Sequence, residues 1–246
     1  MKNDCWAVVP AGGSGSRFSQ TEDKLTVSLG HHPLLVYTLT NLMQASKLSG
    51  AVIAAHPNRL AAYRKLMLEH GAKPNGQESE ELLIHGKIIR LTPGGETRRQ
   101  SVANGLAVLP QTVSIVAVHD AARPLVDAVT VNTAIAKVEA EDVAAIVAIP
   151  VTDTIKEAEG RQIIRTLDRT RLYRVQTPQV FRLDMLRQAH RHVPADYPVT
   201  DDAQLLEVLE LCPIHVVPGS EVNLKVTTLE DLWVAESFLK YRPSPF

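Results

Sequence analysis

The chain reads Pro10-Ala11-Gly12-Gly13-Ser14-Gly15-Ser16-Arg17 immediately after an apolar run, Cys5–Val9, and this stretch decides the fold. The apolar run predicts a buried strand, and the three glycines allow backbone angles that a Cβ would forbid. Such a loop can turn several N–H groups toward one anion. Arg17 and, seven residues later, Lys24 add two positive charges. At the end of a first strand this combination indicates a nucleotide-handling enzyme, although an ordinary strand-to-helix turn also fits the glycines alone.

Two familiar phosphate-binding loops do not match this stretch. A dinucleotide-binding loop needs a third glycine at the position where this chain has Phe18. A P-loop needs Gly-Lys-Ser or Gly-Lys-Thr, whereas Lys24 lies between Asp23 and Leu25. A nicotinamide-dependent oxidoreductase is therefore a disfavoured alternative.

Length, composition and charge exclude several classes of protein. The 246 residues are 45% hydrophobic and carry a formal net charge of −1. This favours one domain, residues 1–246. The near-neutral charge gives no support for nucleic-acid binding, and no apolar run approaches the roughly 18 residues of a membrane span. Cys5 and Cys212 are the only cysteines, so we expect buried thiols and a cytoplasmic location.

Short apolar runs alternate with segments of helical spacing. The expected strands are Cys5–Val9, Ala51–Ala55, Lys87–Leu91, Ser114–Val118, Val143–Ile149 and Ile214–Val217. One helix is expected to begin at Pro33, and three others are expected at residues 102–109, 131–138 and 229–239. Thr227 and Glu230 have capping-box spacing in front of the last helix. Runs that are apolar throughout suit parallel strands covered on both faces, so the chain predicts a doubly wound α/β sheet.

Two polar stretches interrupt the alternation. Residues 72–81 contain Pro74-Asn75-Gly76 and predict a surface loop. Residues 152–176 are charged and roughly alternating, with a turn expected at Glu159-Gly160, and predict a β-hairpin too polar for the core. A projecting arm of this size usually covers a partner subunit or a substrate.

The segment His119-Asp120-Ala121-Ala122-Arg123-Pro124 closes the expected strand Ser114–Val118. A carboxylate at this edge of the sheet, across from a phosphate loop, is well placed to hold Mg²⁺, which prefers one or two carboxylates plus substrate phosphates. Alternatively, Asp120 caps the next turn and pairs with Arg123. The residues alone leave these two interpretations open.

A second glycine-rich loop, Gly94–Ser101, leads into an expected helix. Gly95 could let a flat base lie against the backbone and Ser101 could hydrogen-bond its edge, but a turn followed by a helix start also explains the loop. Helix capping alone explains Thr200-Asp201-Asp202. The nine histidines form no pattern that predicts a zinc site.

Seven motifs occur in a fixed order between about Ala7 and Leu239. Besides the two glycine-rich loops they are His119–Pro124, Asp153–Lys156, Thr177–Gln179, Thr200–Ala203 and Asn223–Thr227. Together they resemble the motifs of the 2-C-methyl-D-erythritol 4-phosphate cytidylyltransferase family. The resemblance implies a doubly wound, mostly parallel, Rossmann-like fold of the nucleotide-diphospho-sugar transferase type. It also implies that the β-arm at residues 152–176 interlocks with a partner in a homodimer.

The resemblance further implies transfer of a cytidylyl group from CTP to 2-C-methyl-D-erythritol 4-phosphate, giving CDP-methylerythritol and pyrophosphate for isoprenoid synthesis. Arg17 and Lys24 match the pair that stabilises the transition state. Arg169 and Lys225 match the pair that positions the acceptor phosphate, and Asp120 matches the acid near Mg²⁺.

The resemblance also assigns binding residues. Those expected to contact CTP are Pro10, Ala11, Gly12, Gly13, Gly15, Gly95, Ser101, Asp120 and Ala121. Those expected near the acceptor are Thr154, Arg169, Thr177 and Lys225. A cytidylyltransferase that uses ribitol 5-phosphate or a similar polyol phosphate stays open as an alternative, because both acceptors are small phosphorylated polyols. A non-catalytic nucleotide-binding protein is a third possibility, which the catalytic motifs disfavour.

One departure from the family pattern lies beside the expected catalytic lysine. Many members have Pro-Lys-Gln, whereas this chain has Asp23-Lys24-Leu25. Asp23 either draws Lys24 away by charge pairing or faces solvent.

Overall fold

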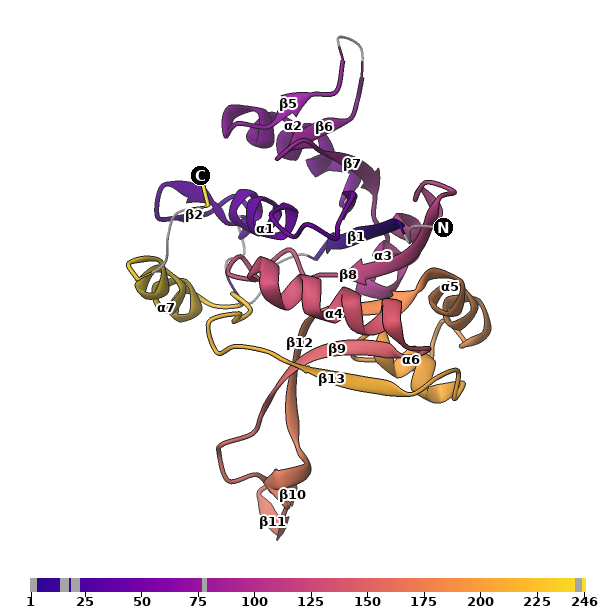
Figure 1. The fold of residues 1–246 in the computed structure, drawn as a ribbon. Helices are drawn as coiled ribbons and strands as arrows, with labels where there is room; N and C mark the ends of the chain where they lie inside the picture. The colour runs from indigo at the N-terminus through magenta and orange to yellow at the C-terminus, as the bar shows by residue number, and fades with distance from the viewer. Residues whose placement is uncertain (1–3, 14–17, 19–22, 77–78, 242–244) are drawn as a thin grey trace.

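One large mixed sheet with helices on both faces organises the chain (Figure 1). The computed structural model describes residues 4–13, 18, 23–76, 79–241 and 245–246. The strands of this sheet are β1 (Asp4–Ala11), β4 (Gly50–Ala55), β5 (Lys73–Pro74), β6 (Leu82–Ile84), β7 (Lys87–Pro93), β8 (Val113–Val118), β9 (Ala144–Pro150), β12 (Tyr173–Arg182) and β13 (Ile214–Pro218). The α-helices are α1 (Leu34–Met43), α2 (Leu60–Glu69), α3 (Arg98–Ala107), α4 (Ala128–Ala140), α5 (Leu183–His192), α6 (Ala203–Val208) and α7 (Leu229–Leu239).

The strand order is β13-β9-β12-β8-β1-β4-β7-β6-β5. At its centre β1 pairs in parallel with β4 and β8, and β4 pairs in parallel with β7. All six expected strands are present. The sequence pattern does not predict β12, which lies antiparallel between β8 and β9. The segment 173–175 is exposed while 176–181 is buried, so β12 lacks the uniform apolar run of its neighbours.

Both faces of the sheet are buried. Residues 5–9 of β1 are all buried, and successive strand side chains point to opposite faces. Trp6 and Val8 pack in a cluster with side chains of α3, α5 and α6. Ala7 and Val9 pack in another cluster with side chains of α1, α2, α4 and α7. This confirms the expected doubly wound architecture.

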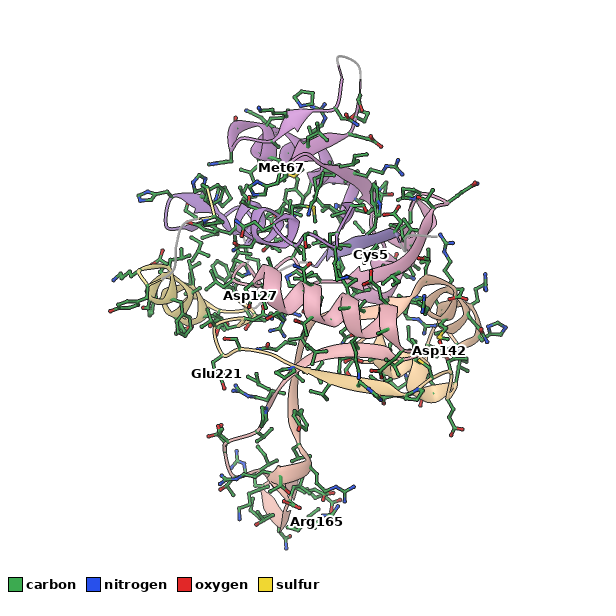
Figure 2. The ribbon with its side chains drawn as sticks, viewed as in Figure 1. Cys5, Met67, Asp127, Asp142, Arg165 and Glu221 are labelled. Carbon is green, nitrogen blue, oxygen red and sulfur yellow. The ribbon has the colours of Figure 1, made fainter. Side chains whose placement is uncertain are left out.

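The arm is a hairpin of β10 (Lys156–Glu159) and β11 (Gln162–Thr166) that projects away from the sheet (Figure 1). Its turn contains Gly160 at φ +57°, a left-handed conformation that glycine adopts at little cost. Figure 2 shows Arg165 on this hairpin, well separated from the body. The hairpin confirms the expectation for residues 152–176, except that residues 173–176 already belong to β12.

The capping box of α7 lies one residue later than expected. Thr228 accepts from the Asp231 N–H, and Asp231 accepts from the Thr228 N–H. Asp231 Oδ2 also accepts from the N–H and hydroxyl of Thr227. The sequence predicts the pair Thr227 and Glu230. Asp231 takes the place of Glu230 because its carboxylate reaches both Thr227 and Thr228. Within the described part of the chain, no helix is long and apolar enough to cross a membrane.

Candidate active site

Three connected hollows lie at the carboxyl ends of the central strands, where open α/β sheets bind ligands. The central pocket has a volume of about 310 Å³. It is lined by Pro10, Ala11, Gly12, Gly13, Lys24, Leu25, Glu96, Thr97, Arg98, Asp120, Ala121, Ala122, Lys225 and Thr227. The first glycine-rich loop continues β1 and the residues around Asp120 follow β8, so neighbouring parallel strands bring the two motifs together.

The other two hollows share residues with the central pocket. One, of about 770 Å³, lies between the two glycine-rich loops and the segment 56–59. The other, of about 260 Å³, shares Asp120 and Lys225 with the central pocket and is also lined by Thr177. Of the expected binding residues, Gly95 lines the larger hollow and Thr177 the smaller one.

Three cations surround the carboxylate of Asp120. Arg98 Nε lies 3.2 Å from Oδ1, Lys225 Nζ lies 2.9 Å from Oδ2, and Arg123 Nε lies 3.6 Å from Oδ2. Burial alone would raise the pKa of Asp120, but the charges of Arg98, Lys225 and Arg123 hold it far below its ordinary value. Asp120 is therefore ionised, and its pairing with Arg123, expected from the sequence, is one of three such contacts.

A chain of hydrogen bonds fixes the backbone beneath Asp120. The Asp120 N–H donates to Thr177 Oγ1 over 3.0 Å. The Thr177 hydroxyl then lies 3.1 Å from Nδ1 of His119, and Nε2 of His119 lies 3.2 Å from the carbonyl of Arg123. Since Nε2–H must donate to that carbonyl, Nδ1 is the acceptor in this arrangement. Burial lowers the pKa of His119 to about 4, so the ring is neutral at pH 7.

Arg98 connects Asp120 to a second buried carboxylate that the sequence does not identify as functional. Arg98 Nη1 lies 2.5 Å from Asp202 Oδ2, and His190 Nε2 lies 3.5 Å from Asp202 Oδ1. Burial favours a higher pKa for Asp202, but Arg98 and His190 hold that pKa below its ordinary value. Within the segment Thr200-Asp201-Asp202, for which the sequence predicts helix capping, Asp201 accepts from the Gln204 N–H and the side chain of Asp202 makes no capping hydrogen bond. Each partner of this link lies within a motif of the family, Arg98 in the second glycine-rich loop and Asp202 in Thr200–Ala203, but neither motif shows that the two side chains pair.

Lys24 also lines the central pocket. Its ammonium donates to the carbonyl of Val226 over 3.3 Å. Val226 is 202 residues from Lys24 in the sequence and directly follows Lys225. Neither expectation for Asp23 is correct, because its carboxylate is largely buried and bonds to Tyr63 and Arg59.

The two glycine-rich loops pack against each other. A Cβ on Gly12 would lie 3.0 Å from Ser101 Oγ, and one on Gly94 would lie 2.8 Å from the same atom. Ser101 is fully buried, and its hydroxyl accepts from the Gly95 N–H and contacts the carbonyls of Gly95 and Thr97. Ser101 therefore shapes the loop, and its direct contact with a base stays a prediction.

The expected acceptor-binding residues of the arm do not line these hollows. Thr154 is exposed. Arg169, in the 3₁₀ turn η2 (Arg169–Arg171), is exposed and donates to the carbonyl of Thr152. Two further expected residues, Gly15 and Arg17, lie outside the described residues.

The acidic side chains of the central pocket are Asp120 and Glu96. Among the residues that the structure describes, no three histidine, cysteine or carboxylate side chains gather in a way that could hold a metal ion. An ion that arrives with a polyphosphate needs one or two protein carboxylates at most.

Comparisons with known proteins identify the family. The family model for IspD, 2-C-methyl-D-erythritol 4-phosphate cytidylyltransferase, matches residues 5–241. The protein of that name from Pelotomaculum thermopropionicum is 39% identical over 239 residues, which cover 96% of this chain and 94% of the relative.

Solved structures agree with this assignment. The 2-C-methyl-D-erythritol 4-phosphate cytidylyltransferase of Francisella tularensis superimposes with a TM-score of 0.74 at 28% identity, covering 96% of this chain and 99% of its own. The enzyme of the same name from Thermus thermophilus has a TM-score of 0.72 at 27% identity, covering 98% of this chain and 100% of its own. The chain therefore belongs to the 2-C-methyl-D-erythritol 4-phosphate cytidylyltransferase family.

Proposed function

We propose that this nucleotidyltransferase transfers the cytidylyl group of CTP to 2-C-methyl-D-erythritol 4-phosphate, giving CDP-methylerythritol and pyrophosphate for isoprenoid precursor synthesis. The observation that carries the proposal is the convergence of Lys24, Arg98 and Lys225 on one pocket beside a glycine-rich loop. Family membership favours methylerythritol phosphate over ribitol phosphate as the acceptor, and it favours a transferase over a nicotinamide-dependent oxidoreductase.

The chemistry explains why the pocket is rich in cations and needs no general base. A phosphate monoester has a second pKa near ~6, so the acceptor is already a dianion at neutral pH. Its oxygen bonds to the α-phosphorus of CTP while the bond to the bridging oxygen breaks, and pyrophosphate leaves with that electron pair. The barrier lies in bringing two polyanions together, which positioning and charge neutralisation overcome.

In this proposal one pair of cations acts on CTP and another pair acts on the acceptor. Lys24 and Arg17 stabilise the charge that develops at the α-phosphate and the leaving group. Lys225 and Arg169 hold the incoming phosphate of the acceptor. The short distance between Lys225 and Asp120, 2.9 Å, supports this division because the carboxylate holds the ammonium at the pocket before the phosphate arrives.

We propose that Mg²⁺ enters the pocket as its complex with CTP, with Asp120 as the protein carboxylate nearest to it. The ion would offset part of the triphosphate charge. Three cations already balance Asp120, so an ion held mainly by the triphosphate fits this pocket better than one held by the protein.

We also propose a cytoplasmic homodimer in which the arm reaches the partner's site. Arg169 and Thr154 lie away from the hollows of their own chain, which supports a role in another subunit's site. The arm also exposes two large apolar side chains, Ile163 and Ile164. Such side chains are typical of a surface that is covered in an assembly.

An acceptor screen tests the reaction. The purified protein with CTP and Mg²⁺ is expected to release pyrophosphate with 2-C-methyl-D-erythritol 4-phosphate much faster than with ribitol 5-phosphate or without acceptor. Lys24→Ala is the matched control, expected to lower kcat on the order of 10²–10³-fold with smaller changes in either KM. Faster release with ribitol 5-phosphate would contradict the proposed acceptor, and an unchanged kcat in Lys24→Ala would remove Lys24 from the mechanism.

A further inference from the structure

The residue before Lys24 is held by a neighbouring helix. The hydroxyl of Tyr63, on α2, donates to Asp23 Oδ2 over 2.6 Å. Nη1 of Arg59, at the end of the 3₁₀ turn η1 (Pro57–Arg59), lies 3.2 Å from Asp23 Oδ1. The same Oδ1 accepts from the N–H of Leu25 over 3.1 Å. Both carboxylate oxygens of Asp23 are therefore occupied, one by Tyr63 and the other by Arg59 and the N–H of Leu25.

These contacts are partly buried, unlike those of an ordinary surface ion pair. Tyr63 is 0% exposed, and the Asp23 side chain is 16% exposed. Burial and the hydrogen bond to Asp23 both raise the pKa of Tyr63, so its hydroxyl keeps its proton at any working pH. A buried hydrogen bond to a charged group is strong and is costly to leave unmade.

The backbone between this anchor and the pocket is a tight turn. The N–H of Thr26 donates to the carbonyl of Asp23 over 2.9 Å, and the N–H of Val27 donates to the carbonyl of Lys24 over 3.3 Å. Leu25 is 4% exposed within the core cluster. Asp23 therefore ties the turn to Tyr63 and Arg59, while the ammonium of Lys24 contacts the carbonyl of Val226.

Arg59 also faces the first glycine-rich loop. Its Nη1 lies 3.5 Å from the carbonyl of Gly13, at the edge of the hollow that both residues line. One guanidinium thus contacts the loop expected to hold the triphosphate and the residue beside the expected catalytic lysine.

We propose that Asp23, Tyr63 and Arg59 form a clamp that positions Lys24 for cytidylyl transfer; the inference rests on the proposed function. A lysine side chain has a flexible four-carbon stem, so its charge is useful at the α-phosphate only if its backbone is fixed. The three are positioning residues, because they act on the reacting atoms through Lys24. They perform this task where many family members have a proline before the lysine.

Tyr63→Phe removes only the hydroxyl and tests the clamp. We expect kcat to fall about tenfold with both KM values within about twofold, because a small displacement of a catalytic group is costly. Tyr37→Phe, which deletes a hydroxyl from a buried ring on the neighbouring helix α1, is the matched control and should leave kcat unchanged.

A double-mutant cycle separates positioning from folding. In the Lys24→Ala background, Tyr63→Phe should cause no further loss of kcat, because the clamp then has nothing to position. The same fractional loss in both backgrounds would overturn the proposal, as would an unchanged kcat in Tyr63→Phe accompanied only by a lower Tm. If Tyr63→Phe does not fold, Asp23→Asn takes its place in the cycle, with the same expected results.

A separate measurement distinguishes failure of the clamp from failure of the proposed function. If the wild-type protein releases no pyrophosphate with any acceptor, the proposed function is wrong. Amide hydrogen exchange without substrates then tests the clamp, since Tyr63→Phe should speed exchange at residues 24–27 and Tyr37→Phe should not. Unchanged exchange in Tyr63→Phe would overturn the clamp.

Discussion

His119 shows how a titratable ring stays uncharged at the edge of a charged pocket. It is 0% exposed, and its two ring nitrogens lie within hydrogen-bond distance of Thr177 and the carbonyl of Arg123. Protonation would turn Nδ1 from an acceptor into a donor and would place a charge where water cannot reach it. Its role is therefore to hold the backbone at Asp120 in place, and at neutral pH its single N–H is already donated to the carbonyl of Arg123.

This has a consequence for stability as a function of pH. The pKa of His119 is about 4 in the native state, below its ordinary value of 6.5. Between these values the unfolded chain binds a proton and the native chain does not, so stability falls as pH decreases from 6.5 to 4. The slope from this residue approaches about 1.4 kcal/mol per pH unit.

His119→Gln is expected to remove this slope while lowering stability at pH 7. Urea unfolding of both proteins between pH 4 and pH 8 measures it, and the other titrating groups cancel in the difference. Equal slopes in the two proteins would show that the pKa of His119 is the same in the native and unfolded states. Asp120 and Asp202, whose pKa values are lowered, contribute at more acidic pH, because their stabilisation is lost below their ordinary pKa values.

Part of the site could be predicted from residues and their spacing. Lys24, Asp120 and Lys225 lie in recognisable motifs, and the structure brings them to one pocket. The link from Arg98 to Asp202 could not be predicted, because the two residues are 104 positions apart and Asp202 has the sequence pattern of a helix cap. A buried ion pair leaves no local signal in a single sequence, since each partner alone looks like a surface charge.

At the scale of elements, the arm provides a direct test of shared sites. In the proposed homodimer, the Lys24→Ala and Arg169→Ala proteins should each have low activity. If the arm acts on its partner's site, a hybrid dimer contains one site with both residues intact. An equal mixture after complete subunit exchange should then recover about a quarter of wild-type activity.

The controls for this experiment are simple. Mixing each variant with itself should recover nothing, and exchange is verified by mass spectrometry of differently labelled subunits. Absence of recovery under verified exchange would place Arg169 in the site of its own chain.

The sequence pattern identifies the parallel strands but not β12, for a physical reason. The central parallel strands β1, β4 and β8 are buried on both faces, so their apolar runs stand out. β12 instead begins exposed next to the arm and shifts register between Val175 and Gln179. Its polar residues Gln176, Thr177 and Gln179 are buried because they serve the site. A strand segment that carries such polar residues lacks the apolar pattern of a strand, so from its polarity alone it is predicted as a loop.

At the scale of the whole molecule, the balance of charge around Asp120 predicts how the protein responds to metal removal. If Mg²⁺ arrives with CTP, EDTA should abolish turnover but leave the Tm of the protein without CTP unchanged. Adding CTP with Mg²⁺ should raise the Tm, because a ligand that binds only the native state stabilises it. Differential scanning fluorimetry measures both effects. A Tm that rises with Mg²⁺ alone would instead indicate an ion bound by the protein itself.

The packing of the first glycine-rich loop against the second limits how this protein can evolve. A Cβ at position 12 would lie 3.0 Å from Ser101 Oγ, so a larger residue there requires Ser101 to shift or to lose its hydroxyl. A lineage that gains alanine at position 12 is therefore expected to favour a smaller residue at position 101. The two positions, 89 residues apart, are thus expected to vary as a pair across descendants of this sequence.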